Sequence, residues 1–292
     1  VDLWNGSTWT QSAWSRTGQQ GTVWLQGTLS LNGYIDGILR IRFRGVTGAG
    51  SSSDMAIDDI QITGTAQPQV RARVFLEGAY DAGTGLHRDQ LRTLPSFALT
   101  EPFSALGYVH VNGGGESTNA SVLATTGPNA IVDWVVLELR DAGNPANVVA
   151  TRSALLQCDG DVVGTDGASA VGFALGTGNY HLAVRHRNHL GVMTASPITL
   201  GASPVSVDLS TTALYGTEPT KNVPGTFPKQ VLWVGDISFN GQLKYVGAGN
   251  DRDPILLRIG GVTPTATATG YHVEDLNLDG TVRYVGAGND RD

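Results

Sequence analysis

The chain has little cysteine, little charge and no long apolar run. Its single cysteine, Cys158, excludes an internal disulfide, so covalent cross-links do not stabilise the fold. Charged residues make up only 15% of the 292 residues, and the 19 lysines and arginines are scattered over a chain of net charge −7. This argues against nucleic acid as a partner, because a phosphate-binding surface needs clustered positive charge. No apolar run approaches the roughly 20 residues that a membrane-spanning helix needs, so we expect no membrane span.

Familiar catalytic motifs are also absent. The sequence has no GxSxG, HExxH or CxxC motif, and the glycine-rich stretch 111–115 is followed by neither a lysine nor a helix, so it is predicted to be a loop. Three histidines lie close in sequence, but His181 and His186 point to opposite faces of a strand and His189 is expected in a turn. We therefore predict that the chain is not an enzyme.

Glycine and short alternating runs, in contrast, are abundant. The chain contains 39 glycines, and runs rich in Val, Thr and Ser are separated by turn signals, which is typical of antiparallel β-structure. Strands are predicted within residues 70–80, 129–141, 148–157, 178–189 and 204–210. We expect an all-β fold of tandem β-sandwich modules, jelly-roll or immunoglobulin-like, with a small C-terminal repeat region. The expected domains are residues 1–66, 67–229 and 230–292.

The last third of the chain contains a duplicated acidic segment. VGDISFNGQLKYVGAGNDRD begins at Val234, and VEDLNLDGTVRYVGAGNDRD begins at Val273. Asp236 and Asp275 are 39 residues apart, and the glycines and tyrosines keep the same spacing, so one structural unit is used twice. The second copy has the D-x-N-x-D-G opening of an EF-hand-type loop.

This alternation suits a calcium ion. Ca²⁺ takes six to eight oxygen ligands at about 2.3–2.6 Å, and the glycine permits the sharp turn that brings the next carbonyl oxygen to the ion. The predicted ligands are Asp236, Ser238, Asn240, Gln242, Asp251 and Asp253 in the first copy, and Asp275, Asn277, Asp279, Thr281, Asp290 and Asp292 in the second. The first copy carries fewer charges, so its affinity should be weaker. The alternative is an ordinary turn, because Asp, Asn and Gly favour turns in any case.

The closing ligand of each loop is open at this stage. Twelve positions from the first aspartate of each copy stands a glycine, which has no side-chain oxygen. Either the residues GAGN are an insertion, or the site is incomplete. With an insertion, the closing carboxylate is Asp251 or Asp253 in the first copy and Asp290 or Asp292 in the second. We favour the insertion.

Two further features concern the neighbourhood of the loops. Asp253 before Pro254 predicts the cap and first turn of a short helix that ends at Gly260. Val282, like Leu243 in the first copy, lies where such loops bury an apolar side chain, so the loops are expected to brace each other. With these motifs, residues 231–292 resemble dockerin-type tandem calcium repeats, which implies paired calcium half-sites and capture of a partner module. The GAGN insertion argues against a standard dockerin surface.

The N-terminal segment contains four of the six tryptophans. The alternation of apolar residues with arginine over residues 39–44 predicts a strand, and the isoleucines of residues 57–62 predict a final one. The motif IRFRGVTGAGSSSDMAIDDI resembles the C-terminal half of a MAM-type domain, a jelly-roll β-sandwich of adhesion proteins and secreted enzymes. We expect the missing strands upstream in a longer precursor, with strands donated by another chain as the alternative. Asp54, Asp58 and Asp59 form either a structural calcium site or an acidic turn.

The middle segment GNYHLAVRHRNHLGVMTASPI resembles a module of secreted bacterial proteins that use type IX secretion. Arg185 and Arg187 are expected on a solvated strand face. The resemblances together imply a secreted bacterial surface protein, structural or adhesive and of fibre-subunit type, with calcium-stabilised repeats. Its expected partners are other subunits or surface modules, or polysaccharide. The alternatives are the accessory region of a secreted enzyme such as a protease, or a carbohydrate-binding module that uses Trp4, Trp9 and Trp14.

Overall fold

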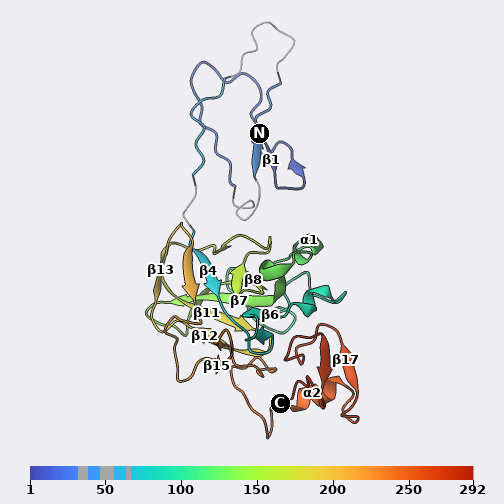
Figure 1. Ribbon diagram of the computed structural model, residues 1–292. Coiled ribbons are helices and arrows are strands. Elements are labelled where there is room, and N and C mark those ends of the chain that lie inside the picture. Colours follow the sequence, from blue (N-terminus) through green and yellow to red (C-terminus); the bar gives the residue numbers. More distant parts are fainter. Residues whose placement is uncertain (32–38, 47–55, 64–66, 292) are drawn as a thin grey trace. The chain divides into compact units, whose positions relative to one another are not determined.

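The computed structural model describes residues 1–31, 39–46, 56–63 and 67–291 of the chain. The chain divides into two compact units, Val1–Gly64 and Thr65–Asp292 (Figure 1). Nearly all of the regular structure is β-strand, which confirms the predicted all-β fold.

The first unit contains a three-stranded antiparallel sheet in the order β2–β1–β3. Its strands are β1 (Asp2–Trp4), β2 (Trp9–Thr10) and β3 (Arg40–Arg42). The buried carboxylate of Asp2 accepts hydrogen bonds from Nη2 of Arg42 and from the backbone N–H of Ser12, both at 2.8 Å. Because Asp2 and Arg42 face each other in the register, this ion pair fastens β3 to β1.

The predicted final strand of the first unit is wrong. The described residues 56–63 contain no strand, and Ile57, Ile60 and Ile62 are all exposed. A strand is stable only where a neighbour pairs with its N–H and C=O groups and one of its faces is buried. Among the described residues of this unit, these isoleucines have neither a pairing strand nor a buried face. Phe43, in the predicted strand of residues 39–44, is exposed as well. Asp54 lies outside the described residues.

The second unit is built on one large sheet, which we call the central sheet. Its strands are β4 (Gln69–Arg73), β7 (Ile131–Asp141), β8 (Val148–Gln157), β9 (Asp161–Val163), β10 (Val171–Gly172), β11 (Gly178–His186), β12 (His189–Met193), β13 (Ile198–Leu200) and β14 (Val205–Asp208). They follow the order β10–β4–β9–β8–β7–β11–β12, with β13 also paired to β11 and β14 to β4. Only the pairing of β14 with β4 is parallel. The strands predicted in the middle segment are confirmed.

Shorter elements complete the second unit. The paired short strands are β5 (Tyr80–Asp81) with β6 (Leu86–His87), β15 (Lys221–Val223) with β16 (Lys229–Val231), and β17 (Thr267–Thr269) with β18 (Thr281–Arg283). The helices are α1 (Ala120–Leu123), α2 (Asp253–Arg258) and the 3-10 turns Gln90–Thr93 and Gly127–Asn129. The predicted short helix is thus confirmed as α2, with Asp253 as its first residue and not its cap.

Strand β7 runs through the core of the second unit. Its residues from Ile131 to Leu139 are buried without interruption, and consecutive strand residues point to opposite faces, so both faces of the strand are covered. The fully buried Trp134 keeps its indole N–H satisfied by donating to the carbonyl oxygen of Ala98 at 2.7 Å. Burying each large apolar side chain of this kind contributes about 1.5–3 kcal/mol.

The duplicated segment packs on the same core. Leu278 of the second copy is buried in the main hydrophobic core, and Phe239, at the equivalent position of the first copy, packs against that core. Both copies are therefore anchored to the central sheet by the residue at the same position of the loop. A second, smaller core lies within the duplicated region and contains Ile237, Ile255, Ile259 and Val282.

Candidate functional site

The two copies of the acidic segment fold into loops that share the hydrogen bonds accepted by their first aspartates. We call residues 236–251 the first loop and residues 275–290 the second loop. The carboxylate of Asp236 accepts hydrogen bonds from the backbone N–H groups four and five residues later, at 2.9 and 2.8 Å. Asp275 accepts from the equivalent groups at 3.1 and 2.8 Å. The first aspartate of each copy therefore closes the turn around it.

A second buried aspartate closes each loop from its far end. The carboxylate of Asp251 accepts hydrogen bonds from the backbone N–H groups of Ser238 and Lys244, at 3.2 and 2.9 Å. Asp290 accepts from the two equivalent groups of the second loop at 3.2 and 2.8 Å, and also from the N–H of Leu276 at 2.8 Å. Each of these two carboxylates therefore connects two separate parts of its loop through backbone hydrogen bonds.

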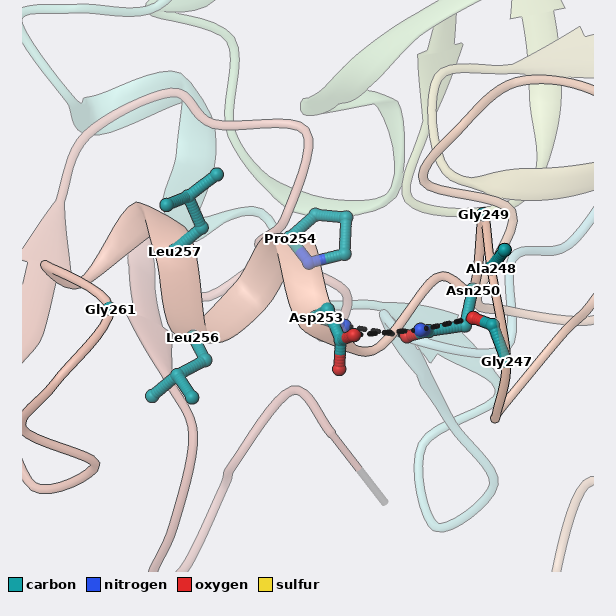
Figure 2. A pocket seen from close by; sticks show the side chains of 9 residues that line it. All are labelled: Gly247, Ala248, Gly249, Asn250, Asp253, Pro254, Leu256, Leu257 and Gly261. Atoms are coloured by element: carbon teal, nitrogen blue, oxygen red, sulfur yellow. Dashed lines mark hydrogen bonds between the residues drawn. The ribbon is translucent and has the colours of Figure 1, made fainter.

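Asp253 does not take part in this arrangement. Its carboxylate is exposed and contacts Asn250 (Figure 2). It also contacts Arg252 at the start of α2. Of the two residues considered for closing the first loop, Asp251 therefore points into the loop and Asp253 points away. Asp292, the equivalent of Asp253, lies outside the described residues.

The GAGN insertion forms a compact turn in both loops. In the first loop, Gly247 and Gly249 have φ of 88° and 67°, and the equivalent glycines have φ of 93° and 67°. Asn250 donates across the turn to the carbonyl oxygen of Gly247 at 2.7 Å, and Asn289 makes the same bond at 2.9 Å (Figure 2). Because glycine adopts positive φ without strain, the insertion can turn back and return the closing carboxylate to the loop. A shallow hollow lies between this turn and α2.

The remaining predicted ligands lie along the loops and are less buried than these aspartates. Asn240 and Asp279 each accept a hydrogen bond from the backbone N–H two residues later, at 2.8 Å. Those N–H groups belong to Gln242, which is exposed, and to Thr281 in β18. The carboxylate of Asp279 also forms an ion pair with Arg283 at 2.5 Å. This arginine competes with any cation for the same oxygen.

Ser238 and Asn277 show how the loops differ. The exposed hydroxyl of Ser238 donates to the carboxylate of Asp236 at 3.5 Å, a long and weak contact. The Asn277 side chain instead donates to the carbonyl oxygen of Gly288 at 2.8 Å, and it accepts from the N–H of Asp279 at 2.9 Å. The second loop is therefore held by more internal hydrogen bonds than the first.

Negative charge in the second loop is buried and close to other negative charge. The pKa of Asp275 is raised to about 7, mainly by burial and also by nearby Asp290 and Asp279, against the attraction of Arg187 and a hydrogen bond from Gly280. Burial likewise raises the pKa of Asp290 and of Asp236 in the first loop. A bound cation would remove this cost, because it neutralises charges that are unfavourable when desolvated.

The donor set fits calcium in its chemistry and in its order along the chain. The aspartate carboxylates are held by backbone N–H groups, yet a carboxylate has about four acceptor sites, so lone pairs are left for an ion. Within residues 1–31, 39–46, 56–63 and 67–291, no three His, Cys, Asp or Glu side chains lie close enough together to hold a metal ion. Binding would therefore require the carboxylates to draw together around the ion, with amide and backbone oxygens completing the shell.

A buried polar cluster joins the second loop to the central sheet. Nε of Arg187 donates to the carboxylate of Asp133 at 2.9 Å, and the hydroxyl of Tyr271 donates to the same carboxylate at 2.5 Å. The guanidinium of Arg187 also lies over the ring of Tyr271, 4.5 Å from its centroid. Beside it, Nδ2 of Asn188 donates to the backbone carbonyl oxygen of Asp275 at 2.8 Å. The sheet thus contacts the backbone of the candidate site directly.

The expectations for Arg187 and His189 are wrong. Strand β11 ends at His186, and its register with β12 shifts there, so Arg187 turns inward and is almost completely buried. His189 begins β12, and its Nδ1 lies 3.0 Å from Nδ1 of His186. Nε2 of His186 in turn contacts the Asp133 carboxylate at 3.1 Å. Burial lowers the pKa of both histidines.

The first loop meets the central sheet through Phe239. The guanidinium of Arg185 lies 4.2 Å from the Phe239 ring centroid and donates to the Phe239 carbonyl oxygen at 3.2 Å. Phe239 and its equivalent Leu278 have φ of 56° and 57°, a left-handed conformation that bulky residues rarely adopt. Burial of each side chain against the core offsets this strain. Sequence reasoning missed these contacts, although an apolar residue at the same loop position in both copies was a usable signal.

Comparison with known protein families gives a match for the N-terminal segment. Residues 4–66 match the family model of the MAM domain, meprin/A5/mu, which confirms the MAM-type resemblance. MAM domains are β-sandwich modules of extracellular or membrane proteins and mediate protein interactions. The match covers less than a quarter of the chain. Searches of curated proteins and of solved structures gave no match. Among the described residues, no helix is both long and apolar enough to cross a membrane.

Proposed function

We propose that the chain is part of an extracellular adhesive or structural protein in which Ca²⁺ binds the first and second loops and fixes them on the central sheet. The MAM match supports the extracellular setting and a role in protein interaction. The observation that supports the calcium proposal is the set of hydrogen bonds that both loops share around pairs of buried aspartates. The proposal assigns no catalytic step to any residue.

In this proposal, four buried carboxylates supply the charge that holds the ions. Asp236 and Asp251 act in the first loop, and Asp275 and Asp290 act in the second, where Asp279 adds a fifth carboxylate. Side-chain amide and backbone oxygens of the same loops complete the shells, as calcium requires. The second loop has the larger negative charge, so it should bind more tightly than the first.

Bound calcium would neutralise the aspartate carboxylates. It would also stabilise the contacts of the loops with the central sheet. Each loop places one apolar side chain, Phe239 or Leu278, against the main core. An ion that holds the loop in its folded form also holds this side chain in position, so binding is linked to folding. Ligand at a hundredfold excess over its Kd stabilises the folded state by about 2.7 kcal/mol per site.

Calorimetric titration of CaCl₂ into the chain tests this proposal. We expect two sites and a rise in Tm with added calcium. Asp275→Asn should remove the tighter site, and Asp236→Asn the weaker one. Asp141→Asn is the matched control, because Asp141 also accepts backbone hydrogen bonds in a turn, at Gly143 and Asn144, but lies outside both loops.

Two outcomes would contradict the proposal. One is the absence of both binding heat and thermal stabilisation at about 5 mM calcium, a concentration above the Kd of extracellular calcium modules. The other is a binding isotherm that Asp275→Asn and Asp236→Asn leave unchanged. The loops would then be turns whose aspartates only accept backbone hydrogen bonds.

A further inference from the structure

Arg187 has two buried carboxylates in its surroundings, those of Asp133 and Asp275. Both aspartates are completely buried, and the arginine is 1% exposed. Asp133 accepts a hydrogen bond from Nε of Arg187 at 2.9 Å. Asp275 accepts instead from the backbone N–H groups of Asp279 and Gly280, at 3.1 and 2.8 Å. The direct ion pair therefore compensates the charge of Asp133 and not that of Asp275.

The backbone at Asp275 is nevertheless bonded to the same part of the central sheet. Nη1 of Arg187 donates to the carbonyl oxygen of His272, and the N–H of Asp275 donates to that same oxygen at 3.3 Å. The neighbouring Asn188 donates to the carbonyl oxygen of Asp275 at 2.8 Å. These bonds fix the guanidinium group close to the first aspartate of the second loop.

The guanidinium group also has a donor to spare. Within the part of the chain that the structure describes, Nη2 of Arg187 is buried and has no hydrogen-bond partner. A buried N–H group without an acceptor is unfavourable, because its hydrogen bonds to water are lost and not replaced. The carboxylate of Asp275 has lone pairs beyond those that the backbone uses. A hydrogen bond between the two, direct or through one water molecule, would satisfy both groups.

Arg187 already acts on Asp275 through its charge. Burial is the main cause that raises the pKa of Asp275, and the attraction of Arg187 is the strongest effect that opposes it. An arginine side chain does not lose its proton in proteins. Any cation that enters the second loop therefore meets a positive charge that is permanently present.

The first loop has a weaker counterpart of this charge. Burial raises the pKa of Asp236, and the attraction of Arg185 opposes it. Arg185, however, also lies 3.8 Å from the carboxylate of Glu138, and its side chain is 25% exposed. Because water screens exposed charges more than buried ones, Arg185 compensates its loop less than Arg187 does.

We propose that Arg187 is a built-in counter-charge of the second loop, which keeps the loop folded when no ion is bound and competes with Ca²⁺ for the charge of Asp275. The competition rests on the calcium binding proposed above. Asp133 determines how strongly Arg187 competes, because the guanidinium group divides its charge between two carboxylates. Two residues outside the second loop thus set the affinity of that loop for calcium.

Two variants that both lack the charge of Asp133 test the competition. Asp133→Asn leaves Arg187 to compensate Asp275, so calcium should bind the second loop about tenfold more weakly than in the parent chain. Asp133→Asn/Arg187→Met removes both charges of the ion pair, a change that proteins often tolerate, and calcium should bind about tenfold more tightly. Calorimetric titration of CaCl₂ measures both. A purely structural role of the pair would weaken binding in both variants, which would overturn the proposal.

Asp161→Asn/Arg73→Met is the matched control. Nε of Arg73 in β4 donates to the carboxylate of Asp161 in β9 at 2.7 Å, so the same two substitutions remove an ion pair elsewhere in the central sheet. The net charge of the chain is the same in both double variants. The control should leave the affinity of both loops unchanged. A control that tightens calcium binding as much as Asp133→Asn/Arg187→Met would also overturn the proposal.

Amide hydrogen exchange without calcium tests the folded state of the empty loop. In the parent chain, the backbone N–H groups of Asp279 and Gly280, which bond to Asp275, should be protected in the presence of EDTA. In Asp133→Asn/Arg187→Met they should exchange about tenfold faster, and added calcium should restore the protection. Equal exchange in the two proteins would show that Arg187 does not stabilise the empty loop. Absence of calcium binding to the parent chain would instead contradict the calcium proposal, and the exchange measurement is independent of it.

Discussion

Arg187 and Asp133 form an ion pair in the interior of the protein, with Nε of the arginine 2.9 Å from the carboxylate and both side chains almost completely buried. The arginine comes from the turn after β11 and the aspartate from β7, and Tyr271, which precedes the second loop, donates to the same carboxylate. The pair therefore joins the central sheet to the duplicated region.

Removing one partner of this pair should strongly destabilise the folded protein. Asp133→Ala leaves a buried guanidinium without its counter-charge, so we expect the free energy of unfolding to fall by about 3–5 kcal/mol. Tyr271→Phe removes one hydrogen bond to the carboxylate and should cost about 1.5–3 kcal/mol. Urea denaturation compares the two variants. An Asp133→Ala variant no less stable than Tyr271→Phe would show that the ion pair does not join the two regions.

His87 should make the fold less stable in mild acid, whereas Asp275, whose pKa is raised to about 7, contributes in the opposite direction. Nε2 of His87 accepts from the N–H of Leu76 at 2.8 Å, and burial lowers the pKa of this histidine to about 4 from an ordinary value of 6.5. A histidine with a depressed folded-state pKa stabilises the fold fully above pH 6.5, and this contribution is lost as pH falls from 6.5 to about 4. The loss amounts to about 3 kcal/mol.

Urea denaturation at about pH 7 and about pH 4.5 measures this dependence. His87→Gln should lower stability at neutral pH, but its stability should change less between the two pH values than that of the parent chain, by about 2–3 kcal/mol. His186 and His189, whose pKa values are also lowered by burial, keep part of the acid sensitivity in the variant. Equal pH dependence in both proteins would exclude His87 as the cause.

Gly78 should be essential for seating the second loop. A Cβ at this position would stand 1.9 Å from the backbone carbonyl oxygen of Leu276, a contact that backbone cannot relieve without moving. We expect Gly78→Ala to cost about 1–3 kcal/mol and to speed amide exchange in the second loop. Gly172→Ala in β10 is the control, because its Cβ would meet nothing within 4 Å. Similar rates of amide exchange in the two variants would mean that the second loop does not pack against Gly78.

The aspartates that close the loops should contribute more to stability than the aspartates that follow them. Asp251→Ala removes the acceptor for two backbone N–H groups of the first loop, so we expect a loss of about 1–3 kcal/mol. Asp253→Ala, two residues later, removes only exposed contacts and should change stability by about 0.5 kcal/mol or less. Thermal denaturation of the pair checks this. A larger effect from Asp253→Ala would mean that the helix start closes the loop.

Much of the central sheet could be predicted from the sequence, because strand periodicity is local. The run 148–157 becomes β8 without a change of bounds, and the run 129–141 contains β7. Arg187 could not be placed in this way. A period of two assigns it to the face of Arg185, but the register shift at the end of β11 reverses its direction, and such shifts arise from pairing between strands.

The candidate site was predictable in its spacing and not in its surroundings. The repeat of 39 residues identified both loops and their first aspartates, but it could not choose between Asp251 and Asp253, since both follow the insertion closely. The structure distinguishes the two residues because Asp251 is buried and Asp253 is exposed, and burial depends on the fold. The expected burial of Leu243 was wrong, because Leu243 is exposed, whereas Val282 is buried in one cluster with Ile237 of the first loop.

The position of β4 in the central sheet has a consequence for how the chain folds. Its neighbours are β9, β10 and β14, and the last of these pairs with it in parallel, more than a hundred residues later in the chain. The hairpin of β7 and β8 can form as soon as those residues exist, whereas β4 must wait for distant partners and for the closure of long loops. During synthesis, β4 is therefore an unpaired strand for longer than any part of that hairpin, and it is open to mispairing before the sheet is complete.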